Sequence, residues 1–234
     1  MSSGSIRAED MVPEVECRFT PGVVERTSAD SGRIGGYGAV FNKLSRNLGG
    51  FVEAVDPSAF NGTRFAEWAG VVARYNHDKT MLLGTAAART MELRVDATGL
   101  WYEVQPPAAR ADILELVQRG DVRHSSFEFR VMPEGDDWNT TDQGYPMRTL
   151  LNVQLFETGP VDSPAYPDAT AGLRSLAAKF DADPAEVRSM AAADDLRRFF
   201  VRTDGPKPPP RPKKKLFGPA AAQALMARRG DPWQ

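Results

Sequence analysis

Three residues that lie far apart in the chain, Ser126, His77 and Glu157, form a chemical set that could cleave peptide bonds. A serine hydroxyl is a weak nucleophile at neutral pH and needs a base within hydrogen-bond reach. Histidine suits that role because its ordinary pKa lies near neutrality. A carboxylate can hold the imidazole in the required tautomer and stabilise its charged form. The three residues are roughly 50 and roughly 30 positions apart, so only the fold could bring them together.

Neighbouring residues offer an alternative for each role. Ser125 is a rival nucleophile. His124 would share a strand face with Ser126 and is an alternative base. Asp78 directly follows His77 and is an alternative orienting group. Serines and histidines are more often structural than catalytic, so residue types alone do not decide between these roles.

Composition excludes several other kinds of site. The chain has 234 residues and a formal net charge of -2, so no overall field favours nucleic acid or a membrane surface. Cys17 is the only cysteine, which excludes internal disulfides and a four-cysteine zinc site. No run of about 18 apolar residues is present, and the N-terminus lacks the apolar core of a signal peptide. We therefore expect one medium domain with a tail and no membrane span.

Three predicted strands carry the candidate residues. Apolar residues at every second position from Phe127 to Val131 predict a strand with one buried face that begins near Ser126. Residues 71–75 predict a buried strand that ends just before His77, and residues 149–156 predict a returning strand that ends at Glu157. The sequence thus predicts that all three candidates lie at strand ends.

The other elements are also mostly strands. They are expected at residues 16–19, 33–41 and 51–55 and in a hairpin of residues 86–95 and 100–105 with a turn at 96–99. A helix is expected to start at Asp56 as its N-cap, and another over residues 108–118 to stop at Gly120. Gly35-Gly36-Tyr37-Gly38 lacks the continuation of a phosphate loop and favours close packing or a bulge. Pro160 cannot donate to a sheet, which predicts that its strand is short or at an edge.

These elements predict an α+β or mainly β fold that is rich in mostly antiparallel strands and has a few helices. The expected organisation along the chain is a flexible N-terminus (1–14), a main domain (15–175), a helical extension (176–204), a Pro/Lys-rich linker (205–215) and a short helical tail (216–234). The linker and tail are expected to be solvated or to serve as a detachable targeting or assembly segment.

Five sequence blocks in register resemble the prohead proteases of tailed bacteriophages, which mature the capsid and are distantly similar in fold to herpesvirus assemblins. The blocks cover about residues 33–175 and are Ile34–Asn42, Val52–Phe60, Asn76-His77-Asp78 with Leu83-Gly84, Ser126-Phe127-Glu128-Phe129, and Leu155-Phe156-Glu157 with Pro164-Ala165. Each block alone is weak, but the shared order and spacing are fairly specific.

The resemblance implies a serine endopeptidase with an assemblin-like fold, that is, an antiparallel, barrel-like sheet surrounded by a few helices. It also implies Ser126 as nucleophile and His77 as general base. Glu157 would take the place of the second histidine of assemblins. The implied substrates are the major capsid protein and scaffold segments, within the assembling procapsid in the host cytoplasm. A homodimer and self-cleavage are further expectations by analogy, while no metal, organic cofactor, membrane or specific nucleic acid is implied.

One departure from the family pattern leaves other functions open. The family commonly has glycine where Glu128 stands, and a strand would place this carboxylate on the same face as Ser126. It could serve as a substrate-side charge or weaken the site. The alternatives are an inactive relative with a scaffolding role in capsid assembly, and an unrelated binding module with a structural histidine and serine.

Overall fold

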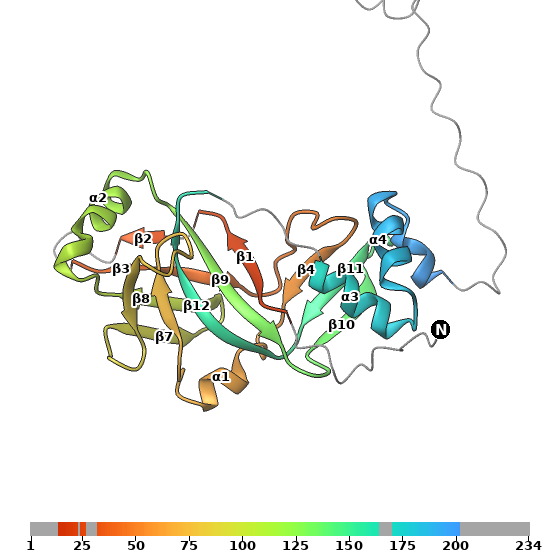
Figure 1. Ribbon diagram of the computed structural model, residues 1–234, viewed down its shortest axis with the longest axis horizontal. Helices are drawn as coiled ribbons and strands as arrows, with labels where there is room; N and C mark the ends of the chain where they lie inside the picture. Colours follow the sequence, from red (N-terminus) through yellow and green to blue (C-terminus); the bar gives the residue numbers. More distant parts are fainter. Residues whose placement is uncertain (1–13, 23, 27–31, 164–169, 202–234) are drawn as a thin grey trace, which may run out of the picture. The chain divides into compact units, whose positions relative to one another are not determined.

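The computed structural model describes residues 14–22, 24–26, 32–163 and 170–201 (Figure 1). Several predicted features lie outside these described residues: nearly all of the N-terminal segment, the Pro164-Ala165 pair, the linker 205–215 and the tail 216–234. Within the described ranges, none of the helices is long and apolar enough to cross a membrane.

A five-stranded sheet carries the candidate residues. Its strand order is β1-β9-β12-β5-β6, with β1 at Glu16–Thr20, β9 at His124–Val131, β12 at Val153–Val161, β5 at Val72–Arg74 and β6 at Leu82–Thr85. β12 therefore lies between β9 and β5, with β9 antiparallel on one side and β5 parallel on the other. This arrangement brings three segments that are distant in the sequence onto neighbouring strands.

Two smaller sheets contain the other strands of the described residues. One has the order β10-β11-β4, with β10 at Asp136–Thr140, β11 at Pro146–Leu150 and β4 at Val52–Val55. The other has the order β2-β3-β8-β7, with β2 at Val24–Arg26, β3 at Ile34–Val40, β8 at Gly99–Val104 and β7 at Met91–Val95.

Short helices connect and cover these sheets. They are α1 at Asn61–Phe65, η2 at Ala108–Arg110, α2 at Ala111–Arg119, α3 at Thr170–Lys179, α4 at Pro184–Ala192 and η3 at Leu196–Phe200. Figure 1 shows α3 and α4 beside the β10-β11-β4 sheet. Gly120 ends α2 with a φ of 83°, a left-handed conformation that favours glycine, as predicted. α3 spans the predicted boundary between the main domain and the helical extension at residue 175. The domain boundaries stay a prediction.

The strand-rich α and β composition is confirmed, but the barrel-like detail is not. The strands of the described residues form three sheets that do not close into a barrel. Two pairings are parallel, β11 with β4 and β12 with β5, so the sheets are not purely antiparallel. Parallel pairing requires long crossover connections, which alternating apolar patterns do not reveal.

The returning strand was predicted in the wrong place. Residues 149–156 belong to two strands, because β11 ends at Leu150, β12 begins at Val153, and Leu151 and Asn152 between them are not part of a strand. As a result, Glu157 lies inside β12 and not at a strand end. Pro160 also belongs to β12, which has nine residues and lies inside its sheet, so the prediction of a short or edge strand was wrong.

One further local prediction needs correction, and one strand was not foreseen. Asp56 does not cap a helix: its Oδ1 accepts hydrogen bonds from the N–H and the hydroxyl of Ser58 in a turn, and the helix begins only at Asn61. The polar stretch after Pro133 contains a strand, because residues 136–140 form β10. β10 pairs with β11, and its Trp138 side chain is buried.

The glycine-rich stretch packs closely, as predicted. A Cβ atom at Gly38 would lie 2.2 Å from Thr158 Oγ1, so only glycine lets β3 pass this close to β12. The β3–β8 register also shifts between Tyr37 and Ala39, which is a bulge. Both features support a structural role for these glycines.

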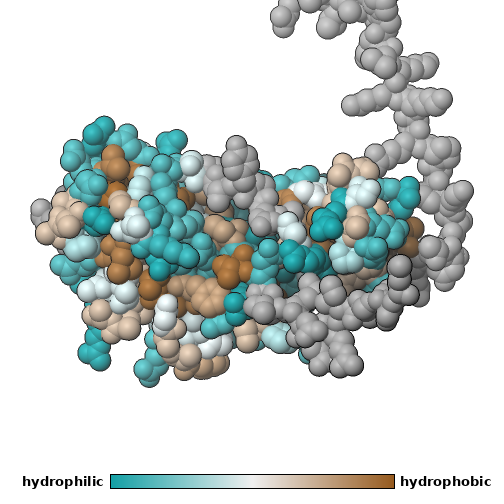
Figure 2. Space-filling view, in the orientation of Figure 1, coloured by the Kyte–Doolittle hydropathy of each residue, from teal (hydrophilic) through white to brown (hydrophobic). Residues whose placement is uncertain are grey.

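Two apolar cores lie among the described residues. The larger is formed by side chains from the sheets, from α2 and from the turn before α1, such as Phe60, Phe127 and Phe129. The smaller joins Phe51 and Trp138 to apolar residues of α3 and α4. On the face drawn in Figure 2, apolar residues lie scattered among hydrophilic ones and do not form one broad patch.

A buried network of ion pairs joins β1 to the β10-β11-β4 sheet. Arg148 lies 2.8 Å from Glu16, 3.1 Å from Glu53 and 2.6 Å from Asp136. Arg18 pairs with Glu16 and Glu53 as well. The side chains of Arg148, Glu16 and Glu53 are each at most 3% exposed, so their charges depend on one another for compensation.

We predict that Arg148→Ala destabilises the fold strongly. The substitution leaves two buried carboxylates with less positive charge, a change that typically costs about 3–5 kcal/mol of unfolding free energy. The matched control is Arg119→Ala, which removes an exposed pair with Glu115 and Asp121 and should cost about 0–1 kcal/mol. Urea unfolding of both variants measures the difference, and similar losses would contradict this account of the network.

Candidate active site

The structure brings His77 and Glu157 into direct contact and places Ser126 on the adjacent strand. Ser126 is the third residue of β9, Glu157 lies in β12, and His77 lies in the turn that follows β5. In the sheet register Glu157 is paired with Glu128 on β9 and with Val72 on β5. The sheet order therefore explains how these distant residues meet.

The turn that carries His77 has an unusual backbone. Asn76 and His77 have φ values of 54° and 57°, in the left-handed region that residues other than glycine rarely adopt. Two hydrogen bonds to the end of β12 hold this turn: the Asn76 N–H donates to Pro160 O at 3.2 Å, and Asn76 Oδ1 accepts from the Asp162 N–H at 3.0 Å. Such conformations cluster at functional sites, where surrounding contacts stabilise them.

Close approach of β5 to β12 is needed to place this turn. A Cβ atom at Gly159 would lie 2.2 Å from the carbonyl oxygen of Arg74. Glycine at this position lets the end of β5 approach β12, next to Glu157. Arg74 and His77 thereby reach the same carboxylate.

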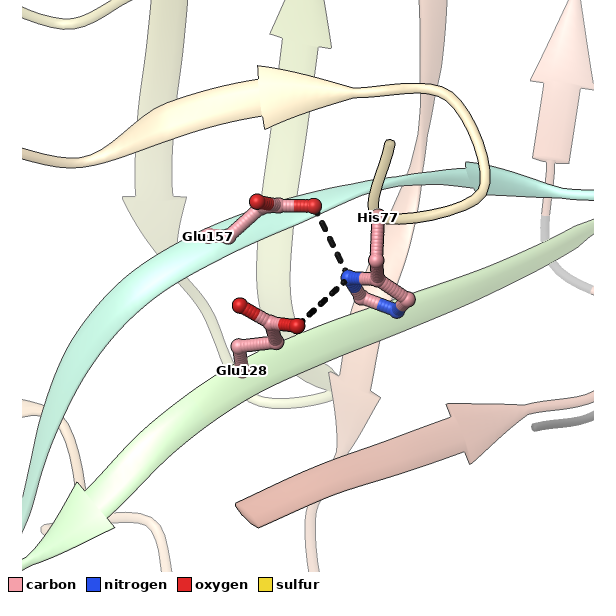
Figure 3. A group of neighbouring side chains, drawn as sticks. All are labelled: His77, Glu128 and Glu157. Carbon is pink, nitrogen blue, oxygen red and sulfur yellow. Dashed lines mark hydrogen bonds and ion pairs between the residues drawn. The ribbon is translucent and has the colours of Figure 1, made fainter. Parts of the chain in front are cut away.

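The imidazole of His77 is held by carboxylates on its Nδ1 side (Figure 3). Its Nδ1–H donates to Glu157 Oε1 at 2.8 Å, and Glu128 Oε1 lies 3.4 Å from the same nitrogen. Arg74 forms an ion pair with the other oxygen of Glu157, which is only 1% exposed. This network fixes the ring orientation and directs Nε2 away from Glu157.

The surroundings of His77 favour its protonated form. Burial lowers its pKa, but hydrogen bonds and charge interactions with Cys17 and Glu157 outweigh that effect and raise the pKa from 6.5 to about 10. The pKa of Glu128 is raised by burial and by the negative charge of Glu157. At neutral pH the imidazole is therefore a cation between acidic neighbours.

A sulfur atom lies between the base and the hydroxyl. Cys17 Sγ is 3.2 Å from His77 Nε2 and 3.1 Å from Ser126 Oγ. The Ser126 hydroxyl donates a hydrogen bond to the carbonyl oxygen of Arg18 at 2.8 Å. Ser126 as a whole is only 1% exposed. Among the described residues, the Ser126 hydroxyl is thus linked to His77 through the Cys17 thiol.

Two residues of this site, Cys17 and Arg74, were not predicted from the sequence. Cys17 is on β1, whose pairing with β9 places it opposite Glu128. Arg74 is the last residue of β5. Neither residue belongs to a recognisable motif, and only the strand register could have revealed them. Glu128 was expected near Ser126, but its carboxylate contacts His77.

The alternative residues have other partners. The Ser125 hydroxyl lies 3.1 Å from the Tyr102 hydroxyl in the core. His124 Nδ1 accepts a hydrogen bond from the Gly22 N–H at 3.0 Å. Asp78 Oδ1 accepts from the N–H and hydroxyl of Thr80, which is a local turn.

The cluster at His77 also has the residue types of a cation site. One ligand atom from each of His77, Glu128 and Glu157 lies within 4.8 Å of the other two. However, the Arg74 guanidinium already neutralises Glu157 and would repel a divalent cation there. We therefore interpret the carboxylates as partners of the imidazole.

We predict that His77 titrates near pH 10 and that Glu157→Gln lowers its pKa. The raised pKa means that the folded state holds this proton more tightly than the unfolded chain. The stability contributed by His77 is therefore complete below pH 6.5 and is lost as the pH rises through about 10. Glu157→Gln removes the charge but retains a hydrogen-bonding group of similar size.

Proton NMR of the imidazole resonances measures both variants. The chain has only two histidines, and His124 should titrate below its ordinary value because burial and the nearby Arg123 charge lower its pKa. A His77→Gln variant assigns the signals. If both histidines of the wild type titrate near 6.5, the described network does not exist in solution.

Comparison with known proteins identifies the family of this chain. The family model described as "Caudovirus prohead serine protease" matches residues 22–182. Searches of curated proteins and of solved structures each gave no significant match. The family match covers more than half of the chain and includes Ser126, His77 and Glu157. The chain belongs to the caudovirus prohead serine protease family.

Proposed function

We propose that this protein is a serine endopeptidase of capsid maturation, with Ser126 as nucleophile, His77 as general base and Glu157 as the orienting carboxylate. The 2.8 Å contact between His77 Nδ1 and Glu157 Oε1 carries the proposal, because it leaves Nε2 free of the carboxylates and turned to the side of Ser126. Membership in the family supports the reaction class.

In the proposed reaction, Ser126 Oγ attacks the carbonyl carbon of a peptide bond while His77 Nε2 takes the hydroxyl proton. His77 then gives the proton to the leaving amine, and water hydrolyses the acyl-enzyme. Backbone N–H groups near β9 would stabilise the oxyanion, each worth about 3 kcal/mol. The base must be neutral to accept a proton, so we expect kcat/KM to rise as the pH approaches the pKa of His77.

The proposed substrates are the major capsid protein and scaffold segments, cleaved within the assembling procapsid in the host cytoplasm. This proposal comes from the family description and not from a substrate contact. The homodimer suggested by the resemblance to assemblins stays a prediction, as do the absence of a cofactor and of specific nucleic-acid binding.

Ser126→Ala should abolish cleavage. Loss of the nucleophile is expected to lower kcat/KM by about a thousandfold or more when the enzyme is incubated with capsid protein and scaffold. The matched control is Ser125→Ala, which removes the neighbouring core hydroxyl and should keep activity within about tenfold of wild type. A serine-reactive fluorophosphonate should label wild type and Ser125→Ala but not Ser126→Ala.

Two results of this experiment would reject the proposal. Equal cleavage by wild type and Ser126→Ala would remove Ser126 from the mechanism. No cleavage and no labelling by any folded variant would favour the inactive, scaffolding alternative, which the unusual carboxylate of Glu128 beside His77 supports.

We also propose that the enzyme removes part of its own C-terminal region. The Pro/Lys-rich segment 205–215 has the composition of an accessible linker. Intact-mass measurement after prolonged incubation should show a shortened chain for wild type and a full-length chain for Ser126→Ala. A full-length mass for an enzyme that cleaves capsid protein would contradict self-trimming.

A further inference from the structure

Cys17 separates the proposed base from the serine hydroxyl. A general base must lie within hydrogen-bond reach of the proton that it takes, either directly or through one water. Here the nitrogen that would serve Ser126 is 3.2 Å from Cys17 Sγ, and the serine hydroxyl donates to a backbone carbonyl. The described arrangement therefore contains all the proposed catalytic groups, but Nε2 of His77 contacts the Cys17 sulfur and not the Ser126 hydroxyl.

Charge strengthens the contact between Cys17 and His77. A thiol next to an imidazole can transfer its proton and form a thiolate–imidazolium pair. The carboxylates of Glu157 on β12 and Glu128 on β9 face the other side of the ring and favour the cation. The positive charge of Arg74 on β5 disfavours the imidazole cation, but this charge is paired with Glu157. The groups around the ring thus favour the arrangement in which His77 cannot accept another proton.

Cys17 is also separate from the matched family region. The family match begins at residue 22, whereas β1 ends at Thr20. Ser126, His77 and Glu157 all lie inside the matched range. Cys17 therefore lies outside the residues that the family model matches.

We propose that Cys17 is a positioning residue that acts as a latch: its sulfur holds His77 Nε2 away from Ser126, and the site becomes active when the thiol releases the imidazole. This inference rests on the proposed function, since it assigns a resting state to the same site. Rotation of the Cys17 side chain about its Cα–Cβ bond would break the contacts of Sγ to His77 Nε2 and to Ser126 Oγ. Ser126 must then turn its hydroxyl from Arg18 O to His77 Nε2.

The latch makes a prediction opposite to that of a proton relay. If the thiol passed the proton from Ser126 to His77, Cys17→Ala would lose activity. If the thiol is a latch, Cys17→Ala should raise kcat/KM at pH 7 and move the rising limb of the pH profile to lower pH. Each pH unit by which this limb moves should raise kcat/KM about tenfold, because the neutral fraction of the base increases by that factor.

Cys17→Ser is the conservative variant. A hydroxyl fits the same place and can hydrogen-bond to both neighbours, but it cannot form the thiolate–imidazolium pair. We expect its pH profile to lie between those of wild type and Cys17→Ala. Fluorophosphonate labelling of Ser126 should follow the same order and be fastest in Cys17→Ala. Adding Ser126→Ala to Cys17→Ala should abolish both the cleavage and the labelling.

Imidazole NMR separates failure of the latch from failure of the proposed function. In Cys17→Ala, His77 should titrate at lower pH than in wild type, whether or not any substrate is cleaved. An unchanged His77 titration, or a folded Cys17→Ala enzyme that is less active than wild type at every pH, would overturn the latch. Absence of cleavage in wild type and variants, together with a His77 titration that moves as expected, would instead reject the protease assignment and leave the contact in place.

Discussion

The buried carboxylate of Glu157 is the constraint on which the site depends. A charge that is almost fully removed from water costs several kcal/mol unless it is paired and hydrogen-bonded. β12 lies between two strands, so Glu157 must find its partners on them or on their connections. Arg74 at the end of β5 and His77 in the following turn supply these partners. The same pairing that compensates this charge orients the imidazole, so stability and chemistry share one interaction.

The turn after β5 illustrates the cost of that arrangement. Left-handed conformations at two successive residues, Asn76 and His77, typically cost about 1–3 kcal/mol each. Hydrogen bonds from Asn76 to the end of β12 and the ion pair at Glu157 offset this cost. A relaxed turn would remove the imidazole from the carboxylate. The strained backbone is therefore a consequence of delivering a side chain from β5 across to β12.

The sequence predicted local features well and long-range features poorly. The alternation in β9 and the stop at Gly120 depend on neighbouring residues, so their pattern is visible in the chain. By contrast, β11 and β12 are separated only by Leu151 and Asn152 but belong to different sheets. Their partner strands, which the local sequence does not show, are what distinguish them. Family blocks identified His77, Ser126 and Glu157 together, but Cys17 enters the site through the register between β1 and β9, which no local pattern encodes.

One face of β1 contributes to the stability of the fold, and the other face contacts the candidate active site. Glu16 and Arg18 point into the buried ion network, while Cys17, which lies between them, points to His77 and Ser126. Because the network anchors the strand, movement of the whole of β1 would disrupt several buried ion pairs. Rotation of the thiol alone breaks only its contacts to two side chains. A latch on this strand can therefore open at low cost, while the strands that hold Ser126 and Glu157 keep their geometry.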